Sequence, residues 1–428
     1  MTRMKDSGIE WIGEVPEDWG IGKLKYYFDV QLGKMLQPSA TSGNDIEIDY
    51  LRAINVQWDN ISVENLSKMW CNPSEVGKYE IKNGDLLICE GGEVGRCGIV
   101  EHLSDKAIIQ NAVHRIRPTE KANVRFLSYY IQHTTKSKWF DILCNKATIA
   151  HLTSEKLLNT IVVLPSISEQ RQIADFLDKK VAQLDKVKSL LEEQIKTLED
   201  YRQSLIYETV TKGLDKTVPL KDSDVDWIGH IPEGWGIGRL KDFVKFQRGF
   251  GFPIELQGKD NGEIPFYKVS DLRGNLDEIC VSKNYVDIQT TKQNAWVIVP
   301  AGAIIAPVIG AALLNNNRKI STTPFISDNN TLAIIPNNKN KYFYYLLKVI
   351  DMNWFNNSST IPAVNISKLA NQVIPTPKEE EQRQIADFLE VQTIKTDKLI
   401  EIKQKQIDNI NQQRQTLIYD VVTGKRRV

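Results

Sequence analysis

Cysteine and histidine are the side chains of this sequence best suited to metal binding or nucleophilic chemistry, and each occurs five times. The cysteines are Cys71, Cys89, Cys97, Cys144 and Cys280. No two of them form a Cys-x-x-Cys pair, and the histidines lack the spacing that metal ligands require. An odd number of unpaired cysteines is typical of reduced thiols in the cytoplasm. We therefore expect a cytoplasmic protein that holds no metal ion.

The glycine-rich segment Gly91–Arg96 is the nearest approach to a phosphate-binding loop. It lacks the Gly-x4-Gly-Lys-Ser/Thr spacing, so it is either a tight turn or a loop that approaches a phosphate backbone with its N–H groups. The sequence also lacks the Asn/Asp-Pro-Pro-aromatic loop of base methylation and the Pro-Asp motif of metal-dependent cleavage. These absences predict a binding protein rather than an enzyme.

Length and charge limit the possible classes of protein. The chain has 428 residues, of which 41% are hydrophobic and 25% charged, so it can form two to four cores. Its formal net charge is zero, which gives no support for a protein that binds nucleic acid by itself. Residues 295–314 carry no charge, but Pro300, Gly302 and Pro307 favour a buried strand–turn–strand over a membrane helix. We expect no membrane segment.

One sequence of nine residues occurs twice, as Glu169–Leu177 and as Glu381–Leu389. Each copy follows a proline-flanked apolar segment and opens a long run without proline or glycine, which predicts a long helix. The interval between the copies is still unchanged at the far end of the runs, where Tyr207 corresponds to Tyr419. A length that is kept while surface residues differ suggests a spacer.

Each helical run has a heptad seam that requires a partner helix. In the first run the seam consists of Ile173, Leu177, Leu184, Leu191, Leu198 and Leu205. In the second run it consists of Ile385, Leu389, Leu399, Ile410 and Leu417, with Thr396 and Lys403 at two leucine positions. A helix of about 42 residues extends roughly 60 Å, too long for one domain core. We therefore expect the two runs to pack on each other, although the first seam could also pair with another chain.

The segments before the two helices also repeat each other. Each begins with a loop that carries two tryptophans, Trp11 and Trp19 in the first copy and Trp227 and Trp235 in the second. Short apolar runs predict strands at residues 49–56, 85–89, 107–116, 265–269, 295–299 and 331–335. One helix follows in each half, at Val124–Thr134 and at Lys341–Trp354. A weaker match between residues 148–157 and 360–369 predicts a constrained loop, either a structural turn or a surface that faces a ligand.

The predicted fold class is α+β. It has two tandem mixed α/β domains separated by two long helices, which pack as an antiparallel coiled coil with a pseudo-twofold internal repeat. The predicted segments are a first domain at 1–164, a central helical spacer at 165–213, a second domain at 214–376 and a distal helical spacer at 377–428.

Two motifs carry a resemblance to a known family. The opening Asp-Ser-Gly-Ile-Glu-Trp-Ile-Gly-Glu-Val-Pro-Glu-Asp-Trp and the duplicated Leu/Thr-Pro-x3-Glu-Gln-Arg-Gln-Ile-Ala-x-Phe-Leu helix start resemble the specificity (S) subunit of type I restriction–modification systems. The resemblance implies two target-recognition domains, each of which reads half of a split double-stranded DNA site. It also implies a coiled coil that sets the gap and docks two methyltransferase (M) subunits, while restriction (R) subunits join for translocation and cleavage. S-adenosylmethionine, ATP and Mg would be used by those partners, with no cofactor bound by this chain and no catalytic residue in it.

From the same resemblance we expect basic residues in the variable loops to contact DNA. The candidates are Lys34, Arg52, Arg96, Arg115, Arg117, Arg248, Lys268, Arg273, Arg318 and Lys319. Arg52 and Lys268 are as far apart in the sequence as Gly33 and Gly249, so each pair should occupy equivalent places. The alternative for each candidate is an ordinary surface charge.

Two other classes of protein remain compatible with the residues. A coiled-coil scaffold unrelated to DNA would not co-purify with a methyltransferase. A nuclease or methyltransferase in its own right would show activity as the purified chain alone.

Overall fold

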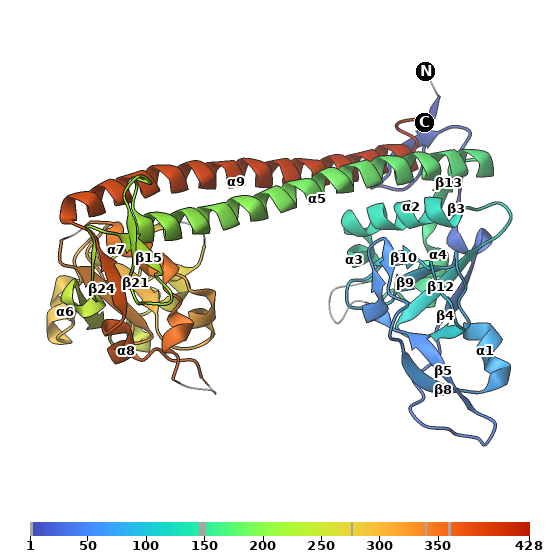
Figure 1. Ribbon diagram of the computed structural model, residues 1–428. Coiled ribbons are helices and arrows are strands. Elements are labelled where there is room, and N and C mark those ends of the chain that lie inside the picture. Colours follow the sequence, from blue (N-terminus) through green and yellow to red (C-terminus); the bar gives the residue numbers. More distant parts are fainter. Residues whose placement is uncertain (1–2, 145–150, 275–276, 339, 358–360) are drawn as a thin grey trace. The chain divides into compact units, whose positions relative to one another are not determined.

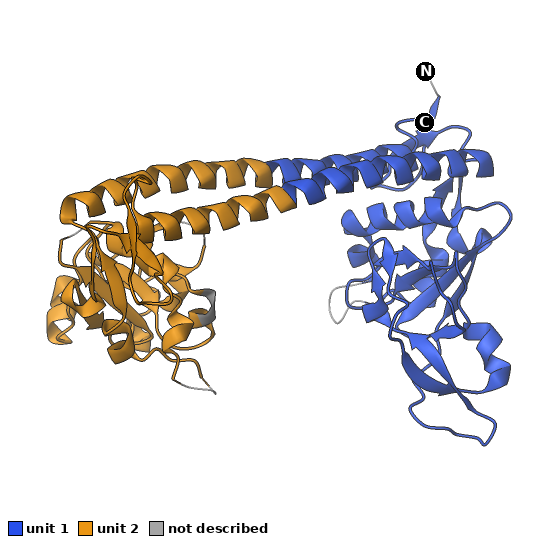
Figure 2. Cartoon of the chain, in the orientation of Figure 1, with its two compact units in different colours: residues 1–192, 405–428 blue, residues 193–404 orange. Residues whose placement is uncertain are grey.

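The computed structural model describes residues 3–144, 151–274, 277–338, 340–357 and 361–428, and it divides into two compact units. The first unit consists of residues 1–192 and 405–428, and the second of residues 193–404 (Figure 2). Each unit therefore contains one globular domain together with part of both long helices. The segments expected from the sequence end where a helix begins, whereas the compact units divide the helices themselves.

The first unit contains a mixed α/β domain (Figure 1). Its strands are β1 (Met4–Asp6), β2 (Glu14–Pro16), β3 (Gly20–Lys23), β4 (Phe28–Leu32), β5 (Ile46–Leu51), β6 (Val56–Gln57), β7 (Asn60–Ile61), β8 (Ser67–Cys71), β9 (Leu86–Cys89), β10 (Cys97–Ile99), β11 (Ala107–Ile109), β12 (Val113–Pro118) and β13 (Ile161–Leu164). Its helical elements are η1 (Leu24–Tyr26), η2 (Ala53–Asn55), α1 (Pro73–Tyr79), α2 (Val124–Lys136), α3 (Trp139–Leu143) and α4 (Ser154–Asn159). One sheet has the order β10-β9-β12-β4 and another the order β11-β5-β8. Helix α2 packs on the first of these sheets and contributes to the same core as the ends of the long helices.

The second unit repeats this plan. Its strands are β14 (Leu220–Asp222), β15 (His230–Pro232), β16 (Gly236–Arg239), β17 (Val244–Arg248), β18 (Ile264–Tyr267), β19 (Glu278–Ile279), β20 (Tyr285–Val286), β21 (Ile304–Pro307), β22 (Lys319–Ser321), β23 (Ile326–Ser327), β24 (Thr331–Pro336) and β25 (Val373–Thr376). Its helical elements are η3 (Leu240–Asp242), η4 (Ile254–Leu256), η5 (Val269–Leu272), α6 (Ile288–Gln293), η6 (Ala311–Asn315), α7 (Tyr342–Val349), η7 (Met352–Phe355) and α8 (Ile366–Ala370). The sheet β17-β24-β21-β22-β19 matches β4-β12-β9-β10 with one strand added, and β20-β18-β23 matches β8-β5-β11.

The two long helices are α5 (Ile167–Lys212) and α9 (Glu379–Val422). In the second unit Gln194 and Arg202 of α5 bond Lys403 and Asp397 of α9, respectively. In the first unit, Val181 near the start of α5 and Val421 near the end of α9 belong to one core. Residues later in α5 therefore lie against residues earlier in α9, so the two helices run in opposite directions. The predicted antiparallel helix pair and the internal repeat are confirmed.

The predicted seam residues lie at different depths. Ile173, Leu177, Ile385 and Leu389 are buried, and Leu184, Leu191, Leu198, Leu205, Ile410 and Leu417 are half-buried. Leu399 is 48% exposed, while the neighbouring Ile400 is half-buried. Thr396 and Lys403 face inward at the leucine positions that the sequence predicted. Only the seam position between them differs, since Ile400 occupies it in place of Leu399.

One glutamine of the repeated motif is buried in both copies and makes the same hydrogen bond in each. Gln170 donates from Nε2 to the carbonyl of Pro165 (2.9 Å) and accepts from the backbone N–H of Asn123 (2.8 Å). Gln382 donates in the same way to the carbonyl of Pro377 (2.9 Å). Gln382 also accepts from Nδ2 of Asn338 (2.8 Å) and from Nδ2 of Asn340 (3.1 Å). Each glutamine thus ties the start of a long helix to the strand exit before it and to the domain of its own unit.

The structure corrects several details of the sequence prediction. The strand expected at 107–116 is two strands, β11 and β12, and the one expected at 49–56 ends at Leu51, after which η2 follows. Residues 295–299 form no strand beyond a single bridge at Val299, because they turn toward β21 after an exposed Val297–Ile298 segment. The helix expected at Lys341–Trp354 ends at Val349, and the 3-10 turn η7 follows it. The strands expected near 85–89 and 331–335 are confirmed as β9 and β24.

We predict that Gln170→Ala lowers the free energy of unfolding by about 1–3 kcal/mol, because it leaves the half-buried N–H of Asn123 and the buried carbonyl of Pro165 unpaired. Thermal and urea unfolding of the full chain would measure this loss. The matched control is Gln172→Ala, an exposed position in the same helical turn. Equal effects of the two substitutions would contradict the role given to Gln170.

Candidate nucleic-acid interface

Several segments of the first domain meet where strands of its two larger sheets end, and we call this meeting point the first loop junction. It consists of Gly33–Lys34, Leu51–Arg52, Glu90, Gln110–Val113 and Leu152. The backbone N–H of Lys34 donates to the carbonyl of Ile109 (2.8 Å), and that of Gln110 donates to the carbonyl of Leu51 (2.9 Å). The N–H of Glu90 donates to the carbonyl of Ala112 (3.0 Å), and that of Leu152 donates to the carbonyl of Glu90 (2.8 Å). Main-chain bonds of this kind do not depend on which side chains the segments carry.

The second domain has an equivalent meeting point, the second loop junction. It consists of Gly249–Phe250, Tyr267–Lys268, Val308, Asp328–Thr331 and Val364. The backbone N–H of Phe250 donates to the carbonyl of Ser327 (2.8 Å), and that of Asp328 donates to the carbonyl of Tyr267 (3.0 Å). The N–H of Val308 donates to the carbonyl of Asn330 (2.9 Å), and that of Val364 donates to the carbonyl of Val308 (2.9 Å). Each bond has its counterpart in the first loop junction, although most of the side chains differ.

The pair Gly33 and Gly249 occupies equivalent places, as the sequence predicted. A Cβ atom on Gly33 would lie 2.2 Å from the carbonyl oxygen of Gln110, and one on Gly249 would lie 1.9 Å from that of Asp328. Two backbones approach so closely at each position that a side chain has no room.

The constrained loop expected at residues 148–157 and 360–369 also contributes to the loop junctions. Leu152 and Val364 each donate a backbone hydrogen bond there, to Glu90 and Val308, respectively. Residues 148–150 and residue 360 lie outside the described part of the chain. The described residues favour the structural turn of the two alternatives.

Arg52 and Lys268 also lie at equivalent places, each directly before a 3-10 turn of its loop junction. The backbone N–H of Arg52 donates to Oδ1 of Asn55 (3.1 Å), and that of Lys268 donates to Oδ2 of Asp271 (2.8 Å). Arg52 is exposed, whereas Nζ of the half-buried Lys268 donates to Oε1 of Gln257 (2.9 Å). The structure therefore brings these two candidates to the same part of each domain.

Arg115 and Arg117 lie on β12 and turn inward. Arg115 is buried and donates to the carbonyls of Lys78 (3.0 Å) and Glu80 (2.5 Å), and its burial lowers the pKa of its guanidinium. Arg117 donates through Nε and Nη2 to both carboxylate oxygens of Asp85 (2.7 and 2.8 Å), which raises its pKa. This placement favours a structural role for both residues rather than a contact with DNA.

Arg318 and Lys319 of the second domain are also buried. Arg318 donates to Oδ1 of Asn316 (2.6 Å) and to the carbonyl of Ile350, and burial lowers its pKa to about 10. Burial also lowers the pKa of Lys319. Cations buried in this way are poorly placed to reach a ligand.

Lys34 and Arg96 lie at the first loop junction or next to it but are engaged by acidic neighbours. Lys34 donates to Oε2 of Glu75 (2.7 Å), and this hydrogen bond raises its pKa. Arg96 donates to the carbonyl of Ala53 (2.9 Å) and lies 3.6 Å from Glu93. The segment Gly91–Arg96 forms the turn between β9 and β10, which favours the tight turn of the two alternatives.

Arg248 and Arg273 are exposed near the second loop junction, as Arg52 is near the first. Within the described ranges these three guanidinium groups form no ion pair, so their charge is available to a phosphate. They stay predictions as DNA contacts, and they are the candidates whose placement suits that role best.

Sequence reasoning missed other side chains at the loop junctions. Asn111 and Asn329 hold equivalent positions, and within the described residues neither side-chain amide forms a hydrogen bond. Met35 and Ile254 are 76% and 85% exposed in the loops that follow Gly33 and Gly249. A free amide suits the edge of adenine, and an apolar tip suits a thymine methyl group. The internal repeat could have predicted that Asn111 and Asn329 are equivalent, because they are as far apart in the sequence as the repeat-related glycines Gly84 and Gly302.

The fold and the paired loop junctions define a protein with two copies of one recognition domain. The model of the family described as type I restriction modification DNA specificity domain matches residues 16–199 and 232–412. These two matches cover most of the chain, so the protein belongs to that family and carries two such domains in tandem.

Relatives match a large part of the chain or nearly all of it. A putative type I restriction enzyme MjaX specificity subunit from Methanocaldococcus jannaschii is 25% identical over 97% of this chain and 96% of its own. The EcoBI specificity subunit from Escherichia coli is 26% identical over 67% of this chain and 62% of its own.

Solved structures share the fold. A chain from a study of complex assembly and conformational transition of the type I R-M system has a TM-score of 0.74 at 17% identity, over 96% of this chain and 99% of that one. The HsdS subunit from Thermoanaerobacter tengcongensis has a TM-score of 0.52 at 17% identity, over 96% and 98% of the two chains.

The described residues show neither a metal site nor a membrane helix. They contain no cluster of three or more His, Cys, Asp or Glu side chains placed to hold a metal ion. Among their helices, none combines the length and the apolar composition that a membrane crossing needs.

We predict that substitution of two of the arginines changes the stability of the fold to different extents. Arg115→Met should lower the free energy of unfolding by about 3 kcal/mol, because it leaves buried carbonyls and Asp29 without their cation. Arg52→Ala should leave unfolding unchanged within about 0.5 kcal/mol, since its side chain is exposed. Thermal unfolding combined with DNA binding of the assembled methyltransferase would separate the two. The assignment fails if Arg115→Met unfolds like the parent chain.

Proposed function

We propose that this chain reads DNA sequence for a type I restriction–modification complex, and that each recognition domain reads one half of a bipartite double-stranded site. The observation that carries the proposal is the pair of loop junctions, in which the same main-chain hydrogen bonds hold different side chains. A backbone that is kept while its exposed side chains differ is suited to reading two different short sequences. The helix pair joins the two readers in one chain.

The helix pair would act as a ruler. Direct reading of DNA takes place at base edges in the major groove, and two readers of one protein must match the helical repeat of the duplex. A fixed helix length therefore converts into a fixed number of base pairs between half-sites. In support of this reading, the interval between the two copies is the same at the repeated helix start as at Tyr207 and Tyr419.

The chain would depend on partners for affinity and for all chemistry. Because its formal net charge is zero, two M subunits would supply much of the phosphate neutralisation, and the chain alone should bind DNA weakly with a steep salt dependence. Methylation with S-adenosylmethionine would reside in M, and ATP- and Mg-dependent translocation and cleavage in R. We assign no reaction and no cofactor to this chain, and we place the complex in the cytoplasm.

Sequencing of methylated bases in a host that expresses this chain with its M partner tests the proposal. We expect one bipartite motif with two half-sites and one fixed gap. The matched control expresses M without this chain and should give no motif. The proposal fails if no bipartite motif appears, or if the purified chain methylates DNA by itself.

Asn329 offers a sharper test within one domain. Because an asparagine that bonds adenine contributes about 1–3 kcal/mol of discrimination, Asn329→Ala should reduce methylation of the parent site by roughly 5- to 150-fold. It should relax one position of one half-site and leave the other half-site unchanged. Asn111→Ala should relax the opposite half-site, and Asn409→Ala, an exposed position on α9, serves as the control. Relaxation of both half-sites by one substitution would contradict the division of labour.

A further inference from the structure

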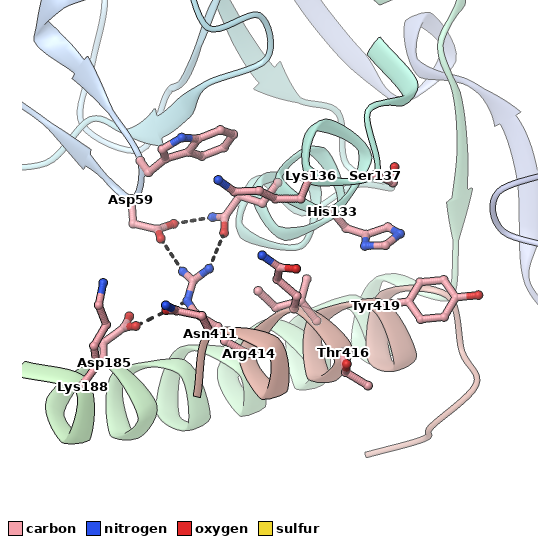
Figure 3. A pocket seen from close by; sticks show the side chains of 14 residues that line it. Asp59, His133, Lys136, Ser137, Asp185, Lys188, Asn411, Arg414, Thr416 and Tyr419 are labelled. Atoms are coloured by element: carbon pink, nitrogen blue, oxygen red, sulfur yellow. Dashed lines mark hydrogen bonds and ion pairs between the residues drawn. The ribbon is translucent and has the colours of Figure 1, made fainter. Parts of the chain in front are cut away.

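Arg414 of α9 connects the helix pair to the first recognition domain. Its Nη2 donates to Oδ2 of Asp59 (2.6 Å), its Nη1 to Oε1 of Gln132 (3.4 Å), and its Nε lies 3.4 Å from Oδ1 of Asp185 on α5. Figure 3 shows the guanidinium between Asp59 and Asp185, at the wall of a cavity of about 660 Å³. The Arg414 side chain is 19% exposed, so water weakens these interactions less than those of a surface pair.

Asp59 is hydrogen-bonded through both its backbone and its side chain in the turn between β6 and β7. Its φ of 59° lies in the left-handed region, which aspartate tolerates better than most residues. Its backbone N–H donates to the carbonyl of Cys97 (3.3 Å), and its carboxylate also accepts from Nε2 of Gln132. The bonds of Asp59 to Cys97 and Gln132 therefore connect Arg414 to the body of the first domain.

The turn is joined in its own right to the first loop junction. Trp58, next to Asp59, donates from Nε1 to Oε1 of Glu93 (2.7 Å). Glu93 lies 3.6 Å from Arg96, which donates to the carbonyl of Ala53 (2.9 Å). Ala53 follows the exposed Arg52. Polar contacts, together with two pairs of residues adjacent in the chain, therefore connect the helix pair to a candidate DNA contact.

The second unit supplies a natural comparison. Arg202 is the repeat equivalent of Arg414, and Asp397 is the equivalent of Asp185. Arg202 forms an ion pair with Asp397, which links helix to helix. Lys348 lies near enough for both charges to act on its pKa, but within the described residues no hydrogen bond joins Arg202 to the second domain. The hydrogen-bonded link from arginine to recognition domain is therefore a property of the first unit.

We propose that Arg414, through Asp59, is a positioning residue that sets the orientation of the first recognition domain on the helix pair, and so the gap between half-sites that the complex accepts. The proposal rests on the proposed function. One base pair advances about 3.4 Å along the duplex, so a small tilt of the domain is enough to admit a neighbouring gap. Arg414 acts on DNA only through the domain that it holds.

The test measures methylation of DNA by the complex of the full chain with M. The DNA substrates carry both half-sites, separated by the parent gap or by a gap one base pair shorter or longer. The readout is the ratio of methylation at the parent gap to methylation at the altered gaps. Arg414→Ala should lower this ratio at least tenfold, and Asp59→Asn should lower it as well. Arg414→Lys should be intermediate, because a lysine can reach one carboxylate but cannot bond three acceptors in a plane.

The control is Arg202→Ala, which removes the equivalent pair between the helices and should leave the ratio unchanged. The proposal is overturned if Arg414→Ala lowers methylation equally at all gaps, or if Arg202→Ala lowers the ratio to the same extent. Should Arg414→Ala fail to fold in thermal unfolding, Asp59→Asn decides, and an unchanged ratio there overturns the proposal. Failure of the proposed function is distinct, since the parent complex would then show no bipartite motif at any gap.

Discussion

The structure depends on the burial of helix ends in the domain cores. The start of α5 and the end of α9 enter the core of the first domain through residues such as Ile173 and Val421, and the end of α5 and the start of α9 enter the second through Val210 and Leu389. Full burial of one such side chain contributes about 1.5–3 kcal/mol. Rotation of a domain on the helices would expose several of them, so neither core is complete without residues from the far part of the chain.

The loop junctions solve a different physical problem, which is to change recognition without changing the fold. Their main-chain hydrogen bonds tolerate Lys34 in one domain and Phe250 in the other, as well as Glu90 in one and Val308 in the other. The close backbone approach at glycine is the part that cannot vary. Side chains around such a scaffold can diverge at little cost in stability, because buried backbone groups remain paired.

The sequence was most informative where it repeats itself. Repetition located both long helices, the antiparallel pair, and the equivalence of Arg52 with Lys268, since two copies of one motif must fold alike. It was least informative about single charges. Arg115 and Arg318 look like surface cations in sequence, but their partners include carbonyls of residues 32 to 37 positions away. Such pairings follow from the sheet order and leave no local pattern.

The sequence by itself determined the duplicated architecture, the helix lengths and the family, because periodicity, proline and glycine positions and a repeated motif are properties of the chain. Only the tertiary structure decided which cations are free, which residue of α9 faces inward, and that Arg414 contacts a turn 355 positions earlier in the chain. The reason is that burial and ion pairing depend on distances between segments that folding brings together.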